Sequence, residues 1–519
     1  MRLTSSINDR LMTRNRRWLI SLPAVGISLL MARVALATPE LPIDDLTYLD
    51  LYRLQDLGRT PSGALVETRP LTEAQAQSLL LEAGGQPSPI LLDPALRGFW
   101  ARPTQRVTAR LALDTDTARP YSVPARYRNL VGSVDLACEH QEGRPCGDGA
   151  HGLLELDSSA GFGPWLSAFS RIQVGANSND GSASARADRL YANLEWGPAE
   201  LLVGRNVILI GPGRHTQLLW GDHASPLDQL ALKIREFRVP SVPVTIGGAY
   251  ILGRLAAPQR FNNTLVTLSR AYVNIADRLC LGLSNLLELG GEGAPQLGFW
   301  QFAEEHVHRT GPAETEGVSN RRVGVDMTLS LPPLRSTFYS EIVFEDSRRQ
   351  FGSALAYDTD YLLGWATSAL GHKRRYGFTV EFYRTGVRSQ EHGLFSAGMT
   401  NKGRVVGAPL GPDATSLYVS PRWNLEQLGI ALSPWAEVAR LGSSTYAFVE
   451  HGPVTKLASG TPEVRLRGGA QVIGTLRSGL WLQAGGYLEH VNNEAFEVRS
   501  RNNAGLSLAL VWQGHSTIK

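Results

Sequence analysis

The chain has 519 residues, of which 43% are hydrophobic and 19% charged, and its formal net charge is +3. Residues 1–37, a predicted secretory signal, carry six arginines and one aspartate, so the mature chain keeps 45 of the 51 basic and 47 of the 48 acidic side chains. This nearly neutral balance excludes a general nucleic-acid or membrane-surface footprint for the mature chain.

The first 37 residues have the three parts of a secretory signal. Arginines 14, 16 and 17 supply the basic start, Trp18 to Met31 the apolar core, and Ala35-Leu36-Ala37 the cleavage pattern. An uncleaved anchor is the alternative, although the apolar run is short for a membrane span. No later segment holds 18 consecutive apolar residues, so we predict no transmembrane helix.

Residues 38–103 are predicted to form a periplasmic helical module. Leucines recur at helical spacing from Leu46 to Leu57, and Gly58 is a suitable stop. A second helix is predicted from about Thr72 to Ala83, because Thr72 and Gln75 have the spacing of a capping box. Residues 93–100 form a predicted third helix. The module is too small to bury much core alone, so we expect it to pack on the barrel without entering its wall.

Alternating strands begin near Thr104. In residues 322–331 every second residue is apolar and the residues between are small or polar, which gives a strand one apolar and one polar face. Clear alternation occurs at 186–196, 227–236, 278–287, 321–331, 335–346, 374–385, 430–438, 463–473, 477–490 and 504–512. Weaker alternation occurs at 104–114, 126–137, 150–159, 163–175, 199–205, 243–254, 263–275, 359–369 and 415–424. Of these nineteen candidates we predict that about eighteen form the wall, because single-chain bacterial barrels have even strand numbers, and that one early candidate lies outside it.

The predicted fold is therefore an all-β membrane barrel over residues 104–512, with a small N-terminal helical plug and a tail at 513–519. Short and long connections alternate along the chain, as expected for periplasmic turns and outer loops. The long ones are 176–185, 206–226, 290–320, 347–358, 386–414, 441–462 and 491–502. We expect a helix within 290–320, since its apolar residues lack a strand period. A water-soluble β-sandwich also has alternating strands, but it has no reason to sort its loops by length.

The chain has three cysteines. Cys138 and Cys146 bracket a polar stretch, and we predict that they form a disulfide in an outer loop. Two free thiols are the alternative. Cys280 lies in an apolar strand and is interpreted as a small buried side chain. No cysteine or histidine spacing indicates a metal site, and no cofactor is expected.

Two long loops combine turn residues with polar and aromatic side chains. Sugar sites use flat aromatic faces together with planar polar groups, and arginines bind the carboxylates of acidic glycans. The candidate polysaccharide-binding residues are Arg214, His215, Trp220, Asp222, Asn401, Lys402, Arg404 and Asp413. The alternative is that both loops only shape the mouth of the barrel. Charged residues on the predicted inner face, such as Glu341, Glu381 and Glu437, are interpreted as a solvated wall.

The same motifs carry a family resemblance. Val203-Gly204-Arg205 leads into Gly211-Pro212-Gly213, and it is followed by residues 226–230 (PLDQL), Phe344-Glu345-Asp346 and residues 403–414 (GRVVGAPLGPDA). This order resembles the Wzi-type capsule assembly outer-membrane proteins over most of the mature chain. The resemblance implies a β-barrel with helices at its periplasmic end that binds capsular polysaccharide at the cell surface.

We therefore predict an outer-membrane protein that binds exported capsular or exopolysaccharide and anchors it. Expected partners are this polysaccharide and outer-membrane lipid, with no nucleic acid, and the chain is expected to be a monomer. No G-x-S-x-G, H-E-x-x-H or phosphate-loop motif is present, so we predict no enzyme. A porin for sugars or other small solutes is the alternative function, and an open lumen would favour it.

Overall fold

The computed structural model describes residues 40, 47–61, 69–82, 105–116, 121–122, 133–134 and 149–516, with gaps at 164, 179–180, 296, 308–317, 346–350, 372–374, 393, 426–427, 443, 449–453 and 478. The predicted signal, the third helix at 93–100 and the Cys138–Cys146 disulfide lie outside these residues. The division of the chain into signal, helical module, barrel and tail stays a prediction.

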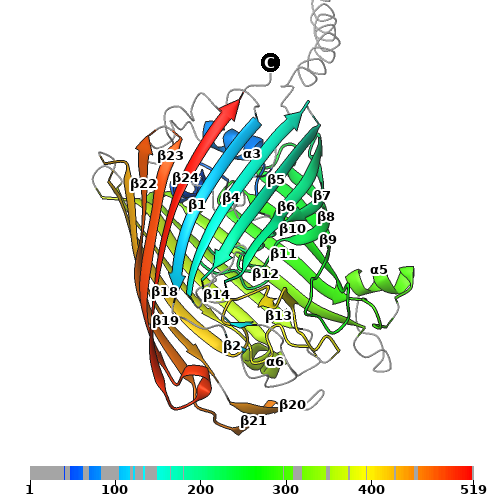
Figure 1. Ribbon diagram of the computed structural model, residues 1–519. Coiled ribbons are helices and arrows are strands. Elements are labelled where there is room, and N and C mark those ends of the chain that lie inside the picture. Colours follow the sequence, from blue (N-terminus) through cyan, green and yellow to red (C-terminus); the bar gives the residue numbers. More distant parts are fainter. Residues whose placement is uncertain are drawn as a thin grey trace, which may run out of the picture.

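Eighteen antiparallel strands close into a barrel, which confirms the predicted strand number (Figure 1). Each strand pairs with its neighbours in the ring, and the first strand pairs with both the second and the last, so the wall has no free edge. The wall strands are β1 (Gln105–Asp116), β4 (Gly149–Phe162), β5 (Leu166–Asn177), β6 (Ala183–Trp196), β7 (Ala199–Asn206), β8 (Leu227–Arg238), β9 (Val244–Arg254), β10 (Leu265–Ile275), β11 (Leu279–Leu289), β12 (Ser319–Leu331), β13 (Ser336–Glu345), β14 (Thr359–Leu370), β15 (Tyr376–Arg384), β18 (Ala414–Leu425), β19 (Ile430–Leu441), β22 (Glu463–Arg477), β23 (Leu480–Asn492) and β24 (Ser500–Ser516).

The early candidate at 126–137 does not contribute a described wall strand. Its residues 133–134 form β3 (Ser133–Val134), which belongs to a small separate sheet. The other strands of this sheet are β2 (Tyr121–Ser122), β16 (Thr400–Asn401) and β17 (Arg404–Val405). A two-stranded sheet of β20 (Thr445–Phe448) and β21 (Val454–Ala458) lies in another long connection.

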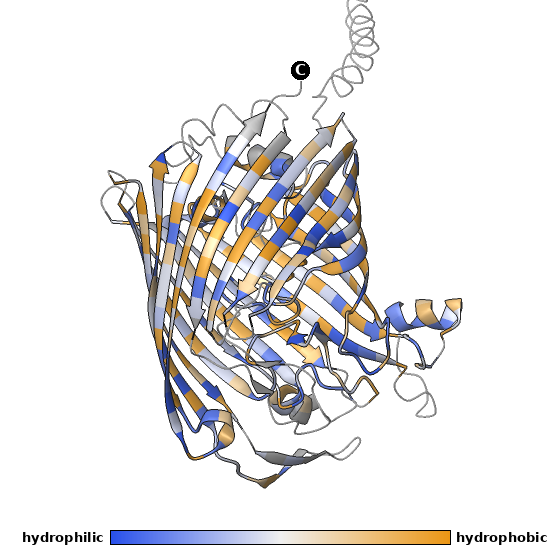
Figure 2. Ribbon diagram, in the orientation of Figure 1, coloured by the Kyte–Doolittle hydropathy of each residue, from blue (hydrophilic) through white to orange (hydrophobic). Residues whose placement is uncertain are grey.

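The alternation seen in the sequence sorts side chains between the two faces of the wall. On β12, Val325 and Met327 are exposed on the outside while Asp326 is buried on the inside. Figure 2 shows the same banding of orange and blue along the strands around the barrel. An apolar outer face with polar residues inside is the arrangement of a barrel that sits in lipid.

Long connections gather at one end of the barrel and short turns at the other. The loop end carries β20, β21 and the helix α6 (Phe351–Tyr357), and the C-terminus lies at the opposite end (Figure 1). The helix expected within 290–320 is present as α5 (Phe299–Val307). Two described connections contain short 3-10 helices, η3 (Pro332–Leu334) in a turn and η6 (Glu494–Phe496) in a loop. By the usual asymmetry, the loop end faces outward and the short-turn end faces the periplasm.

Two N-terminal helices lie at the short-turn end, α2 (Thr47–Asp56) and α3 (Glu73–Glu82) (Figure 1). The predicted capping box is confirmed, because Thr72 N donates to Gln75 Oε1 at 2.7 Å and Gln75 N donates to Thr72 Oγ1 at 3.2 Å. The inward-facing Ser330 and Thr337 hydroxyls donate to Gln55 O and Asp56 Oδ1 of α2, at 2.9 and 2.8 Å. No helix in the described part of the chain is long and apolar enough to cross a membrane.

The interior differs from the solvated wall that the sequence analysis expected. Glu341, Glu381 and Glu437 are all buried. Connections 207–226 and 385–413 contribute apolar side chains to a core cluster that also contains inward-facing wall residues. Its loop members are Ile208, Ile210, Leu218, Leu219, Trp220, Ala224, Met399, Val406, Ala408 and Leu410. The expectation of a water-filled lumen fails here because the two loops fill the space that water would occupy.

We predict a disulfide between Cys138 and Cys146, in the connection between β1 and β4. Closing a loop this short should stabilise the folded chain by about 2–3 kcal/mol, because it removes conformations from the unfolded state. Intact-mass analysis of the alkylated protein before and after reduction should show two thiols that become reactive only after reduction. Alkylation of both cysteines in the folded, unreduced protein would contradict this.

Asp50 should make the attachment of α2 depend on pH. Burial raises the pKa of Asp50 to about 7, against smaller opposing effects of Arg422 and Arg53. Because this value lies above the ordinary 3.8, the contribution to stability is complete below pH 4 and is lost as the pH rises through 7. Asp50→Asn should abolish this pH-dependent loss of stability, which is on the order of 4 kcal/mol at most. The protection of residues 47–56 from hydrogen exchange, corrected for intrinsic rates, should weaken from pH 4 to pH 8 more in the parent than in the variant.

The difference between the two proteins is the quantity to measure, because burial also raises the pKa of Glu40 to about 7. Both proteins share that second effect. Equal slopes in parent and variant would show that Asp50 does not carry the dependence.

Candidate functional site

A buried carboxylate on the wall holds the deepest part of loop 207–226. Glu381 of β15 accepts hydrogen bonds from the backbone N–H groups of three consecutive residues, Arg214, His215 and Thr216, at 2.7, 3.0 and 2.8 Å. The Tyr339 hydroxyl donates to the same carboxylate at 2.6 Å. Four donors on one carboxylate offset much of the cost of burying its charge, and they satisfy backbone groups that would otherwise lack partners.

Glu341 repeats this arrangement for the next part of the loop. It accepts from Leu218 N at 3.0 Å and from Leu219 N at 3.2 Å. Gly211 approaches this carboxylate so closely that a Cβ atom at residue 211 would lie 2.7 Å from Glu341 Oε2. Gly211 also has a φ of +121°, so the close approach and the backbone conformation both require glycine.

One arginine connects the two loops. Arg322 of β12 is fully buried, with its Nε 2.7 Å from Glu345 Oε1 and its Nη2 bonded to Asp360 at 2.5 Å. Its Nη1 donates to Leu218 O of loop 207–226 at 3.2 Å. The two carboxylates in turn accept N–H groups of loop 385–413, from Gln390 at 2.9 Å and from Gly386 at 2.7 Å.

The first two predicted site residues lie deep in the barrel. Arg214 forms an ion pair with Asp56 of α2, and its guanidinium carbon lies 4.7 Å from the centre of the Tyr52 ring. His215 stacks on Tyr418, with ring centres 3.6 Å apart and planes inclined by 11°. Arg214 therefore binds the N-terminal module, far from the loop end.

Trp220 and Asp222 lie where the two loops meet. Trp220 is only 2% exposed, so its ring offers no open face to a sugar in this arrangement. The N–H of the adjacent Gly221 donates to Val406 O at 2.6 Å, which joins the loops through their backbones. Asp222 is also buried.

The remaining candidates belong to loop 385–413. Asn401 accepts from Ala256 N at 2.9 Å and donates to Ser225 O at 2.8 Å, and Arg404 Nη1 donates to His223 O at 3.3 Å. Lys402 is exposed at the tip of the β16–β17 hairpin. Asp413 is the last residue of the loop, where its N–H donates to Gly386 O at 2.8 Å. The structure thus joins Asn401 and Arg404 to the end of loop 207–226, and it places Arg214, His215 and Asp413 elsewhere.

A charged cluster at the rim was missed by the sequence analysis. Arg205 forms a two-point ion pair with Asp228, at 2.6 and 3.1 Å, and Arg254 Nη2 lies 3.0 Å from the same carboxylate. Lys402 at the hairpin tip is exposed but partly desolvated, and this partial burial, followed by the charges of Arg186 and Arg205, lowers its pKa. We call Arg186, Arg205, Arg254 and Lys402 the rim cations.

The sequence contained a signal for part of this cluster. Arg205 ends one predicted strand and Asp228 lies at the start of the next, so pairing the two strands as a hairpin would have placed the side chains opposite each other. Arg254 and Arg186 come from strands further along the ring. Within the described residues, no group of three histidine, cysteine or acidic side chains could hold a metal ion.

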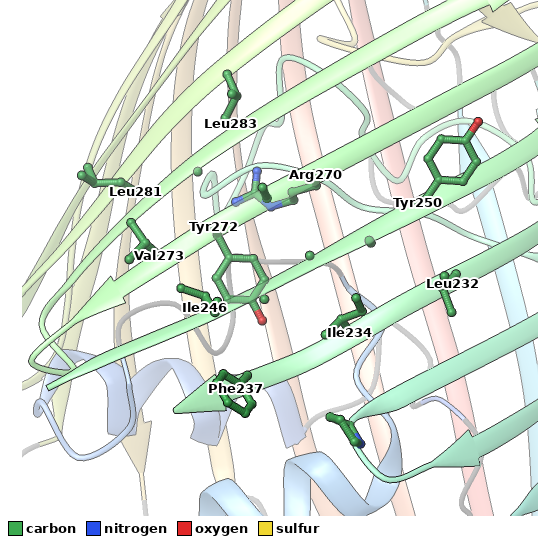
Figure 3. A pocket seen from close by; sticks show the side chains of 16 residues that line it. Leu232, Ile234, Phe237, Ile246, Tyr250, Arg270, Tyr272, Val273, Leu281 and Leu283 are labelled. Carbon is green, nitrogen blue, oxygen red and sulfur yellow. The ribbon is translucent and has the colours of Figure 1, made fainter. Parts of the chain in front are cut away.

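One apolar hollow is not part of this site. It has a volume of about 900 Å³ and is lined mainly by apolar side chains of β8 to β11. Figure 3 shows Leu232, Ile234, Phe237, Ile246 and Leu283 around it. Leu232, Ile234 and Leu283 are exposed side chains of the outer face, so the hollow faces the lipid side of the wall.

Comparison with known proteins identifies relatives of this chain. A family model described as capsule assembly protein Wzi matches residues 129–504, well over half of the chain. No curated protein matches the sequence.

Solved structures of similar fold exist. Wzi of Escherichia coli, described as an outer-membrane protein involved in group 1 capsule assembly and a carbohydrate-binding β-barrel, is 16% identical, with a TM-score of 0.66 over 93% of this chain and all of that chain. OprD of Pseudomonas aeruginosa is 11% identical, with a TM-score of 0.46 over 80% of this chain and 93% of its own. OccK1 (OpdK) of the same organism is 12% identical, with a TM-score of 0.46 over 80% of this chain and 99% of its own.

Replacing Glu381 should release the deep part of loop 207–226. Glu381→Ala removes the acceptor of three loop N–H groups and leaves them buried, at a cost on the order of 3–5 kcal/mol. Hydrogen exchange should accelerate at residues 214–216. The matched control is Asp157→Asn, because Asp157 is a buried carboxylate that pairs with Arg171 on the neighbouring strand at 2.7 Å. Unchanged exchange at 214–216 in the Glu381 variant, or equal acceleration in the control, would refute this role.

Proposed function

The chain belongs to the capsule assembly protein Wzi family, and we propose that it binds exported capsular polysaccharide and anchors it at the cell surface. It is an outer-membrane protein, an eighteen-stranded barrel with an apolar outer face. The observation that carries the proposal is that wall carboxylates pin two long loops inside the barrel and thereby support a fixed, cation-bearing rim at the loop end.

A solute channel needs a continuous water-filled path through the barrel. The porin alternative is therefore not favoured, because the interior is packed. An apolar core that loops 207–226 and 385–413 form together with inward-facing wall residues lies inside the barrel. We propose that α2 and α3, tied to loop 207–226 through Asp56 and Arg214, act as a plug at the short-turn end. A barrel filled in this way supports surface binding better than diffusion through the pore.

Residues at the rim are the proposed contacts for the glycan. Lys402 and Arg404 come from the predicted set, and the other rim cations add guanidinium groups that suit the carboxylates of an acidic polymer. Asn401 would fix the hairpin through its two backbone contacts. Arg214, His215, Trp220, Asp222 and Asp413 remain proposed site residues, and their surroundings support a role in holding the loops rather than in touching sugar.

The proposal is one of binding and not of catalysis. What supports this is the use made of the polar groups: the buried carboxylates near the loops accept backbone N–H groups, and the rim charges pair with each other. We further propose that the signal is cleaved after Ala37 and that the mature chain is a monomer in contact with outer-membrane lipid.

Removing a rim cation should weaken polysaccharide retention. Lys402→Gln should lower the affinity for an acidic capsular polymer by about two- to fivefold, the usual range for one exposed ionic contact. The deficit should disappear near 1 M salt, where the Debye length is about 3 Å. Binding of purified polysaccharide to the detergent-solubilised chain and the amount of capsule shed by cells are the measurements.

Arg499→Gln is the control. Arg499 is an exposed arginine in another connection of the loop end, paired with Glu494 and Glu497, so the variant removes the same charge from a different part of the rim. If both variants bind as the parent does, the site lies elsewhere on the loops. If both weaken binding equally, the attraction comes from net charge alone and not from the proposed cluster.

A further inference from the structure

Helix α5 lies on the outside of the barrel. Figure 1 shows it projecting sideways from the wall near the loop end. Its last turn touches the wall, where His306 Nε2 lies 3.1 Å from Tyr250 Oη of β9 and 2.9 Å from Thr267 Oγ1 of β10. The other ring nitrogen lies 2.8 Å from Phe302 O within the helix.

The wall positions under this contact face lipid and not the lumen. Thr267 is two residues from Leu265, which is 36% exposed on the same face, and it is paired with Leu287 of β11. Leu287 shares its face with Leu283, which is 56% exposed, yet Leu287 itself is fully buried. The segment that contains α5 therefore covers part of the lipid-facing surface, with exposed leucines on either side of it along the strands.

A second set of polar contacts fixes the same end of the helix. Glu305 accepts a hydrogen bond from Ser319 Oγ at 2.5 Å, and its carboxylate lies 3.5 Å from Arg321 of β12. Arg321 pairs with Leu287 across the strands, so these contacts lie beside the His306 contacts. The helix is thus attached to β9, β10 and β12 through its C-terminal turn.

The other end of α5 carries two exposed aromatic rings. Phe299 and Trp300 are each 75% exposed and pack edge to face, with ring centres 5.3 Å apart. At a rise of about 1.5 Å per residue, six residues place Trp300 roughly 9 Å along the axis from His306. The rings therefore lie away from the end of the helix that contacts the wall, and they project beyond it (Figure 1).

We propose that α5 is an interfacial anchor that inserts Phe299 and Trp300 into the outer leaflet of the membrane. Continuity with the lipid-facing surface favours lipid as the occupant, because the helix is attached to the outer face of the wall between exposed leucines and projects from it. Aromatic side chains, tryptophan above all, favour the boundary between headgroups and acyl chains, and an amphipathic helix lying in this plane binds through them. The anchor fixes the depth of the barrel beside β9 to β12.

Quenching of tryptophan fluorescence by brominated phospholipid tests the proposal. The full chain is reconstituted into vesicles of phospholipid brominated near the start of its acyl chains, and Trp300→Phe is compared with the parent. The fluorescence difference between the two reports Trp300 alone. Bromolipid should quench most of this difference relative to unbrominated vesicles, while aqueous iodide should leave it nearly unchanged.

Two matched variants calibrate the result. Trp365→Phe removes an exposed ring of the outer wall that stacks on Phe338, and its difference signal should be quenched by bromolipid. Trp435→Phe removes a ring on the inner side that lies under Arg467, and its signal should resist bromolipid. A Trp300 signal that is quenched by iodide and not by bromolipid overturns the anchor. A signal protected from both, together with a dimer by native mass spectrometry, also overturns it and assigns the rings to a second copy.

Discussion

The structure depends on hydrogen bonds between carboxylates of the wall and backbone N–H groups of the loops. A barrel lumen lined with glutamates buries charge at a high cost unless donors surround each carboxylate. A loop folded into that lumen would bury backbone N–H groups that have no sheet partner. Glu381 and Glu341 meet both needs at once, because the loop supplies the donors and the wall supplies the acceptors. Neither arrangement would be stable without the other, so the loop is part of the barrel's interior and not a mobile flap.

Arg322 extends this coupling to the second loop. Its guanidinium joins Glu345 and Asp360 to the carbonyl of Leu218, while the same two carboxylates bind N–H groups of loop 385–413. With both loops fixed, their apolar side chains pack into a common core. The hairpin that carries Lys402 and Arg404 is therefore supported by two loops that the wall holds in place. A rigid rim reduces the ordering cost of binding a long, flexible polymer.

The sequence predicted the wall better than it predicted the site. Period-two alternation reveals which residues face out, and short and long connections reveal the ends, so the strand number and the position of α5 followed. The capping box at Thr72 was equally local. How deeply a loop enters the lumen cannot be predicted from its own residues. The turn composition around Arg214 and Trp220 is the same whether the loop rests on the rim or reaches α2. Only the distant partners, Glu381 of the wall and Asp56 of α2, decide this, and they lie more than 150 residues away in sequence.

Salt should affect the buried charges that hold the loops and the exposed charges of the rim differently. The carboxylates that hold the loops are buried and bonded at short range, so dissolved ions reach them poorly and screen them little. The rim cations and Asp228 are partly exposed, with Arg254 about half accessible. Their proposed attraction for an acidic polymer would fall once the Debye length drops below the spacing between charges. If the rim binds the polymer as proposed, high salt should release it while the loops stay in place, because the buried contacts that hold the loops are screened much less.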